Sequence, residues 1–348
     1  VLPYKYATEL RKIFYSPTKE IDEFELIQIL LELLPKDPAP VISSLPARLQ
    51  PFSGQEVQIQ VIAQRNWRSE QNYRFETKVL NTLSSSSHKQ ITVTSALRTG
   101  EFIALANRTA GLFDGLTSDE TDGVKQTHLI MQSLDESLRS VGASLQDSIK
   151  LESYYFGTSR KEWSPLAKAR ADYFKEPGPP ATAIPYNDIF PYGSKTKVGA
   201  LAMRELRNTY DKYIPREDSW PPRVWDWQLN LPWRQAQKLR GMVWLGGQVP
   251  AEPFSNTGKR MFPGELLPQT RFTMSYVEDL LRPFNCKTSD IKLLVCYFQK
   301  SNDENIIGKM LELLRNCCGG VLPPLTLIPV PHMQTPDSTV EIWGVVQS

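Results

Sequence analysis

The chain has 348 residues, of which 41% are hydrophobic and 22% are charged, and its formal net charge is +2 at neutral pH. This composition is typical of a globular protein of two or three domains, and a charge so close to zero gives no reason to expect nucleic acid or an anionic membrane as a partner. No apolar run is long enough to span a bilayer and no secretion signal opens the sequence, so we expect a cytoplasmic protein.

The cysteines and histidines predict no metal site. The four cysteines lie in the last quarter of the chain, with a spacing that fits neither a zinc ribbon nor a disulfide framework, and the three histidines are scattered. We therefore expect reduced thiols and no bound metal. No glycine-rich phosphate loop occurs, and no cofactor is expected.

The chain begins with an incomplete structural unit, residues 1–66. The segment at 10–34, LRKIFYSPTKEIDEFELIQILLELL, predicts a strand and a helix. A proline-bounded strand is predicted in LPARLQPF at 45–52, and a last strand in EVQIQVIAQ at 56–64. A polar linker is expected at 67–87.

A first full unit is predicted at 88–208. It has a strand and bend at 101–111, a helix at 123–142, and a β run, SIKLESYYFG, at 148–157. A second helix follows at 164–174, then the proline-bounded strand PPATAIPY at 179–186, then a last strand at 197–203. The unit therefore runs β-β-α-β-α-β-β, and its helices can cover one face of a mixed sheet.

A connector, predicted at 209–227, joins this unit to the next. Four tryptophans lie in or just after it among prolines: Trp220, Trp225, Trp227 and Trp233. We expect a strap packed into a groove between units, because so many aromatic side chains are costly to leave in water. A cage for an aromatic ligand is the alternative.

A second full unit is predicted at 228–348, and it repeats the first. Both first helices start with Gln-Thr and carry apolar residues at i, i+3, i+7 and i+10. The later segments, DIKLLVCYFQ at 290–299 and PPLTLIPV at 323–330, match their counterparts at Ile-Lys-Leu, Tyr-Phe and the prolines. This alignment makes Tyr155 equivalent to Tyr297, and it places Arg48 of the incomplete unit where the full units have Thr182 and Thr326.

These motifs, above all VWLGGQVP, LPPLTLIPV and VEIWGVV in the last unit, resemble those of the Rid proteins, a family of reactive-intermediate deaminases also known as YjgF proteins. The resemblance implies an α+β fold of the chorismate-mutase-like type, with three units around a central barrel and pockets between units. Two and a half tandem units would form a single-chain pseudo-trimer. Chorismatases, and the C-terminal region of diphthamide-synthesis ligases, are similar in this respect.

The resemblance also implies candidate catalytic residues. Rid proteins hydrolyse imines and enamines, and an arginine after Pro-Ala clamps the substrate carboxylate, which points to Arg48. The glutamate of the family's last strand corresponds to Gln60, Gly199 and Trp343, none of which is a base. Glu341 lies two residues before Trp343 on the same face of its strand and is the candidate substitute.

From these residues we expect a Rid-derived small-molecule enzyme, an imine or enamine hydrolase, deaminase or cyclase, that acts on a carboxylated metabolite at a junction between units. A chorismatase-like enzyme and a non-catalytic ligand-binding or scaffold protein are the alternatives. A homodimer or association with a partner enzyme stays open. The expected substrate-binding residues are Asn107, Arg108, Tyr155, Thr182, Gln248, Tyr297 and Thr326.

Overall fold

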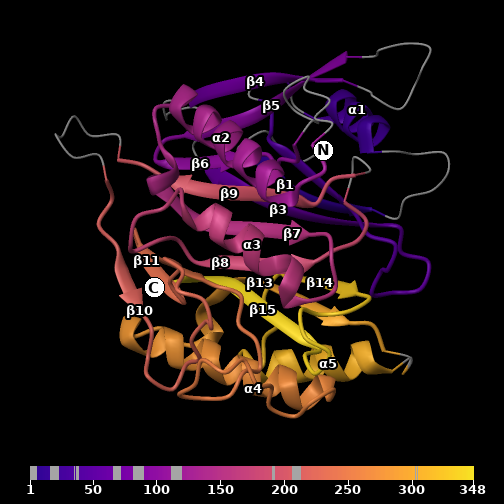
Figure 1. The fold of residues 1–348 in the computed structure, drawn as a ribbon, viewed down its shortest axis with the longest axis vertical. Coiled ribbons are helices and arrows are strands. Elements are labelled where there is room, and N and C mark those ends of the chain that lie inside the picture. The colour runs from indigo at the N-terminus through magenta and orange to yellow at the C-terminus, as the bar shows by residue number, and fades with distance from the viewer. Residues whose placement is uncertain are drawn as a thin grey trace.

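A computed structural model describes residues 6–15, 23–34, 36, 39–65, 72–80, 90–110, 120–189, 193–205, 213–301, 303 and 305–348. Within them the strands form three sheets, each of which belongs to one repeat of the chain. The fold is α+β, as predicted, and the repeats form a single-chain pseudo-trimer (Figure 1).

The first sheet is the smallest and has the strand order β2-β1-β3. It is built from β1 (Tyr6–Tyr15), α1 (Glu23–Leu33), β2 (Ile42–Pro46) and β3 (Val57–Arg65).

The second sheet has the order β4-β5-β6-β9-β7-β8 and carries two long helices. Its elements are β4 (Asn72–Leu80), β5 (Gln90–Thr99), β6 (Phe102–Leu105), α2 (Gly123–Ser140), β7 (Ser148–Tyr155), α3 (Arg160–Ala171), β8 (Ala181–Pro185) and β9 (Thr196–Met203).

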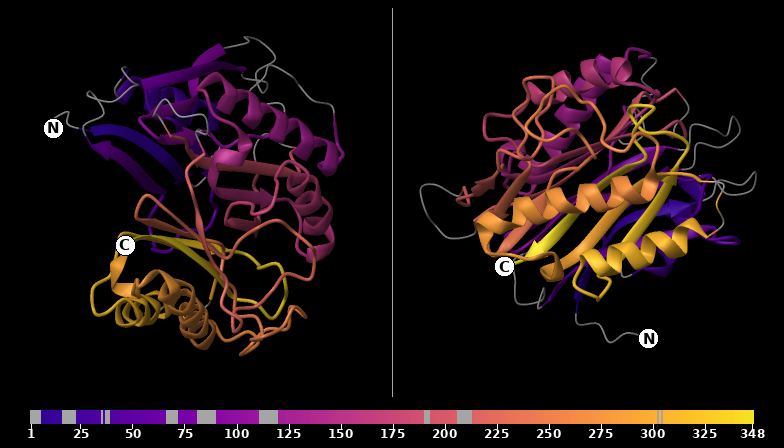
Figure 2. Two further views of the ribbon diagram at one scale, coloured as in Figure 1. Left: turned by 90° about the vertical axis from the view of Figure 1, so that its left-hand side faces the viewer. Right: turned by 90° about the horizontal axis from the view of Figure 1, so that it is seen from below.

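The third sheet repeats this plan in the order β10-β11-β12-β15-β13-β14. Helices α4 and α5 lie side by side across one face of it (Figure 2). Its elements are β10 (Glu217–Ser219), β11 (Ala236–Leu239), β12 (Met242–Leu245), α4 (Leu266–Leu281), β13 (Ile291–Gln299), α5 (Ile306–Cys317), β14 (Leu325–Val330) and β15 (Val340–Gln347). Single-turn 3₁₀ helices occur at Leu145–Asp147, Arg282–Phe284 and Thr288–Asp290.

One apolar core is shared by all three sheets. Leu45 of the first sheet, Leu201 of the second and Trp343 of the third belong to the same buried cluster. Two further clusters fill the space between each larger sheet and its own helices. The three sheets therefore bury apolar side chains against one another, together with Phe24 and Ile27 of α1.

Two segments outside the predicted units are extended. Residues 72–80 of the expected linker form β4, which pairs with β5. Residues 217–219 of the expected connector form β10, which pairs with β11. Both are edge strands. Strand β10 is too short and polar to predict, whereas β4 alternates Tyr73, Phe75 and Val79 with polar residues, a strand pattern that the linker assignment overlooked.

The pairing of strands corrects the alignment of the proline-bounded strands. The partners at the equivalent place in the three sheets are Tyr15 and Pro46, Tyr155 and Pro185, and Phe298 and Pro329. Pro46 therefore ends its strand, Ser43 is the counterpart of Thr182 and Thr326, and Arg48 follows the strand. The predicted equivalence of Arg48 with the two threonines was wrong, because the first copy has prolines at both 46 and 51 and only pairing distinguishes them.

The same register corrects the tyrosine alignment by one residue. Tyr297 pairs with Ile328 as Tyr154 pairs with Ile184, so Tyr154 and not Tyr155 is its counterpart. A shift of one residue moves a side chain to the opposite face of a sheet. The Tyr154 and Tyr297 hydroxyls accordingly share a hydrogen bond of 2.6 Å in the central core, whereas Tyr155 faces the helices.

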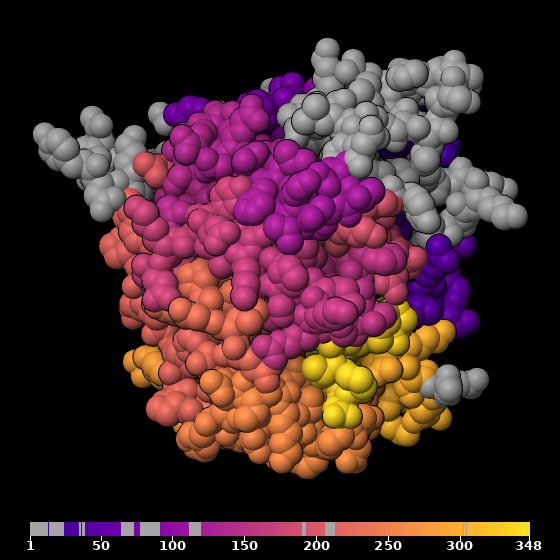
Figure 3. Space-filling view, in the orientation of Figure 1, coloured from indigo at the N-terminus to yellow at the C-terminus, as the bar shows by residue number. Residues whose placement is uncertain are grey.

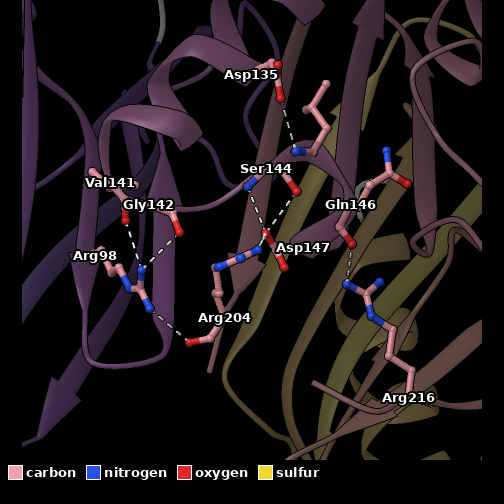
Figure 4. A network of polar contacts seen from close by, with 10 residues as sticks. Arg98, Asp135, Val141, Gly142, Ser144, Gln146, Asp147, Arg204 and Arg216 are labelled. Atoms are coloured by element: carbon pink, nitrogen blue, oxygen red, sulfur yellow. Dashed lines mark hydrogen bonds and ion pairs between the residues drawn. The ribbon is translucent and has the colours of Figure 1, made fainter. Parts of the chain in front are cut away.

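A polar network fastens the turn after α2 to the following segments (Figure 4). The buried Asp147 carboxylate, 1% exposed, accepts hydrogen bonds from the Ser144 amide and hydroxyl and from Arg204 Nη1 at 2.8 Å. Arg216 donates to the carbonyls of Gln146 and Ser148, so the network also holds the chain that enters β10.

Removal of the Asp147 carboxylate leaves these donors without their acceptor. We expect Asp147→Ala to lower the free energy of unfolding by about 3 kcal/mol, because breaking a buried ion pair strands the remaining charge. Urea denaturation measures the change. The exposed pair of Arg139 with Asp135 is the control, and Arg139→Ala should cost less than about 1 kcal/mol. Equal losses in both variants would contradict the assignment.

Candidate functional site

The second and third sheets meet at a junction built from backbone and lysine hydrogen bonds. The Gly247 amide, just after β12, donates to the Ala181 carbonyl of β8 at 2.9 Å. Lys150 of β7 reaches across the junction, and its Nζ donates to Thr182 Oγ1 at 2.7 Å and to the Leu245 carbonyl at 2.8 Å. The two full units are in direct contact on the face shown in Figure 3.

Gly247 is a glycine because the junction leaves no room for a side chain. A Cβ atom there would collide with the Glu341 carboxylate and would lie 3.0 Å from Thr182 Oγ1. The absence of a side chain at Gly247 therefore allows Glu341 of β15 to approach β8 of the other unit.

A cavity of about 90 Å³ lies at this junction. Helix α3 and strand β8 form one side, and the connector and the loops of the last unit form the other. The lining residues are Arg160, Trp163, Arg170, Ala181, Thr182, Ala183, Trp225, Asp226, Trp227, Gln228, Trp233, Gly247, Val249, Gly258, Arg260, Gln334, Thr335 and Glu341.

Glu341 is the buried carboxylic acid of the cavity, and only 8% of it is exposed. Burial raises the pKa of its carboxyl to about 7, although the positive charges of Lys150 and Arg260 and a hydrogen bond from the Ala183 amide act in the opposite direction. The desolvation of the carboxylate thus outweighs its favourable contacts. The group can exchange a proton near neutral pH.

Three arginines and two carboxylates line the cavity, so its surroundings are positive. Arg260 donates to the Gly258 carbonyl at 2.8 Å, and burial lowers the pKa of its guanidinium. Arg170 is 2% exposed, and burial lowers the pKa of its guanidinium to about 10. When Glu341 is protonated, only Asp226 offsets the arginine charges within the lining.

The tryptophans of the connector pack into the groove between units, as predicted, and also form part of the cavity wall. Trp225 and Trp233 are buried, and Trp227 packs edge-on against Trp225 at a centroid distance of 5.3 Å. All three line the cavity together with Trp163 of α3. The strap and the aromatic cage considered above are therefore compatible with each other.

The sequence-predicted site residues are spread over three junctions. Glu341 and Thr182 line the cavity. Thr326 accepts a hydrogen bond from Gln60 Nε2 at 3.2 Å, at the junction of the third sheet with the first. The backbone amide of Asn107 donates to Ser43 Oγ at 2.9 Å, at the junction of the first sheet with the second.

The other predicted residues lie outside the cavity lining, either buried within the protein or exposed on its surface. Arg108 donates to Ser137 Oγ at 2.8 Å, and Gln248 to Gln235 Oε1 at 2.8 Å. Tyr297 lies in the central core, and Tyr155 lies beneath α3. The Arg48 side chain is 73% exposed, pairs with Asp188 at 2.9 Å and does not line the cavity.

Sequence reasoning missed Lys150, Arg170 and Arg260. A signal for Arg170 was present, because Trp163, Leu166, Ala167 and Arg170 follow the i, i+3, i+4, i+7 spacing of a buried helix face. Within the described residues, no group of three histidine, cysteine, aspartate or glutamate side chains comes together to hold a metal ion. No helix in these residues is both long and apolar enough to cross a membrane.

Comparison with known proteins gives matches at the level of structure only. No family model matches the chain, and neither does any curated protein. A chorismatase structure superimposes with a TM-score of 0.52 and 16% identity over 83% of this chain and 82% of that chain.

Structures of single-unit proteins align with one part of the chain. TdcF from E. coli with bound serine gives a TM-score of 0.32 and 20% identity over 38% of this chain and 98% of that chain. The YjgF gene product from E. coli gives a TM-score of 0.32 and 19% identity over 38% of this chain and 98% of that chain. The resemblance predicted from the sequence is confirmed at the level of the fold, which this chain shares along most of its length with chorismatase.

Proposed function

We propose that the junction cavity is the active site of an enzyme that hydrolyses or cleaves a small carboxylated metabolite, with Glu341 as its acid and base. The observation that carries this proposal is the Glu341 carboxyl, which is buried in a positively charged cavity and has a pKa of about 7. A general acid–base group works best when its pKa lies near the working pH.

The cavity offers the groups that such chemistry needs. In its neutral form the Glu341 carboxyl can donate a proton to the substrate, and in its ionised form it can accept one from water. Arg160 and Arg260 can hold a substrate carboxylate, because guanidinium groups bind carboxylates through charge-assisted hydrogen bonds. Tryptophan side chains exclude water around them.

Two reactions fit this arrangement. In the first, an imine nitrogen is protonated, water adds to its carbon and ammonia leaves. In the second, the carbon–carbon double bond of an enol ether carried on a ring is protonated at carbon, and water adds to the cation with loss of a proton. The hemiketal then breaks down to a keto acid and the ring alcohol. The fold shared with chorismatase over 83% of the chain favours the second reaction.

The first test compares turnover of the wild type with Glu341→Gln. Ammonia release is measured with freshly generated imino acids, and keto acid release with chorismate. We expect Glu341→Gln to lower kcat/KM by about 10²- to 10⁴-fold for whichever substrate is turned over, because the amide cannot exchange the proton.

Arg48→Ala is the control, since its side chain is exposed and lies outside the cavity lining. Its activity should equal that of the wild type. Loss of activity in Arg48→Ala with full activity in Glu341→Gln would move the site to the first sheet. Ligand binding without turnover of either substrate class would favour the non-catalytic alternative.

Glu341 also gives stability a defined pH dependence. Its pKa is raised from the ordinary 4.5 to about 7 in the folded state, so the folded protein binds the proton more tightly than the unfolded chain. The contribution is fully present below pH 4.5 and is lost as the pH rises through 7, about 3 kcal/mol in total. Urea denaturation at several pH values measures the free energy of unfolding, which should decline less between pH 4.5 and 7 in Glu341→Gln than in the wild type. An equal decline in both proteins would show that Glu341 is not the group with the raised pKa.

A further inference from the structure

The outer face of β3 lacks the cover that its counterparts in the other two sheets have. Strand pairing makes Ile59 of β3 the counterpart of Val198 in β9 and of Ile342 in β15. Both counterparts are fully buried, because α2 packs across β9 and α4 across β15. Ile59 is 52% exposed, and Val57 and Val61, on the same face of β3, are exposed as well. An apolar stripe that is interior in the two full units therefore lies at the surface in the first.

Strand β3 also has a free edge. Val198 exchanges two backbone hydrogen bonds with Arg108, and Ile342 exchanges two with Gln248. These bonds join the last strand of each full unit to the segment that follows its first hairpin. Strand β3 is the last strand of its sheet, so among the described residues no strand offers such bonds to Ile59. By analogy with its counterparts, the N–H and C=O groups of Ile59 point to this edge.

The inner face of β3 is already occupied by the third sheet. Gln58 Nε2 donates to the Leu327 carbonyl at 2.8 Å, and Gln58 Oε1 accepts from the Leu327 amide at 3.1 Å. Gln60 donates to Thr326 on the same face of β3. These contacts hold β3 in place, so its edge and its outer face are what it presents to a partner.

The composition of β3 is unusual for an exposed edge. Edge strands usually carry charged residues or proline, which prevent pairing with another chain. The outermost strands β4 and β10 follow this rule, because β4 carries Arg74, Glu76 and Lys78, and β10 begins with two acidic residues. Between Val57 and Gln64, β3 has neither a charged residue nor a proline. Its sequence therefore favours pairing with another strand.

A second copy of the chain fits this edge. Two copies of one strand related by a two-fold axis pair antiparallel, as β6 does with β9 and β12 does with β15. With the axis at Gln60, Ile59 lies opposite Val61 of the second copy and Val57 lies opposite its Ala63, so each of these outward pairs is aliphatic. The joined sheet has the order β2-β1-β3-β3-β1-β2, and it has six strands like each of the other two sheets. The strand is thus complementary to itself.

We propose that the chain forms a two-fold homodimer in which the β3 strands of two copies pair edge to edge and join their first sheets. Backbone hydrogen bonds supply the affinity of such an edge, and the aliphatic pairs fix its register. The inference does not depend on the proposed function, since the junction cavity lies between the second and third sheets.

Analytical ultracentrifugation of the full chain tests the proposal. We expect the wild type to change from monomer to dimer between about 1 and about 100 μM, a range that suits a small interface. Ile59→Lys should raise the dissociation constant about 10- to 100-fold, because like charges then meet across the axis. The Ile59 side chain is half exposed, so the thermal unfolding midpoint of the monomeric variant should stay close to that of the wild-type monomer.

Val321→Lys is the matched control. It makes the same change of charge at another exposed aliphatic residue, in the loop after α5, and should dimerise as the wild type does. Hydrogen exchange then locates the interface. In the wild-type dimer the β3 amides that point to the free edge should exchange about 10-fold more slowly than in Ile59→Lys at the same concentration.

Three results would overturn the proposal. The first is a wild type that stays monomeric at about 100 μM, which would leave the β3 edge to a different protein. The second is an Ile59→Lys variant that dimerises as strongly as the wild type. The third is a dimer in which the β3 amides gain no protection, which would place the contact on the outer face or elsewhere on the molecule.

Discussion

Each sheet of this protein has an inner face that it cannot bury alone, and the rest of the structure depends on this constraint. Leu45, Leu201 and Trp343 reach one apolar cluster from three different sheets, and the Tyr154 and Tyr297 hydroxyls meet inside it. Polar groups so deeply buried need a partner, and here each tyrosine supplies the partner of the other. Packing of the sheets and formation of the junctions are therefore one event.

The junctions have equivalent positions but different chemistry. On the last strand of each unit, one residue pairs with an aromatic residue of the neighbouring strand. These pairs are Gln58 with Phe14, Lys197 with Tyr154, and Glu341 with Tyr297. A homotrimer would carry the same side chain three times, whereas a fused chain can vary each one. Among these three positions only the third has a carboxylate, and the Gly247 backbone gives it space beside Thr182. The candidate acid therefore occurs at one of the three equivalent positions.

Much of the fold could be predicted from the sequence, because helices and strands leave local periodic patterns. The apolar stripes of α2 and α4 and the repeated order of elements indicated repeated α+β units, and the resemblance of their motifs to Rid proteins implied the pseudo-trimer. Register could not be predicted in the same way. The prolines at 46 and 51 are equally plausible strand ends in the sequence, and a one-residue shift exchanges Tyr154 for Tyr155. Only the paired strand decides between them.

The candidate site was predicted in part for the same reason. Glu341 and Thr182 could be found because they lie in or beside motifs that resemble those of Rid proteins. Arg260 could not, because charged residues are usually solvated and its burial depends on contacts from the other unit. Arg170 could have been found only from the buried-face spacing that it shares with Trp163 and Leu166. Residue-by-residue transfer from a family motif also led to Arg48, which the strand register places beyond the end of β2.

The connector that carries Trp225 and Trp227 is covalently continuous with both units that form the cavity. Separate subunits meet at a rate and to an extent set by their concentration, so a pocket between them empties as the solution is diluted. In a tethered chain the local concentration of one wall relative to the other is fixed by the tether. The cavity of this protein should therefore persist at dilutions at which a pocket shared between independent chains would come apart.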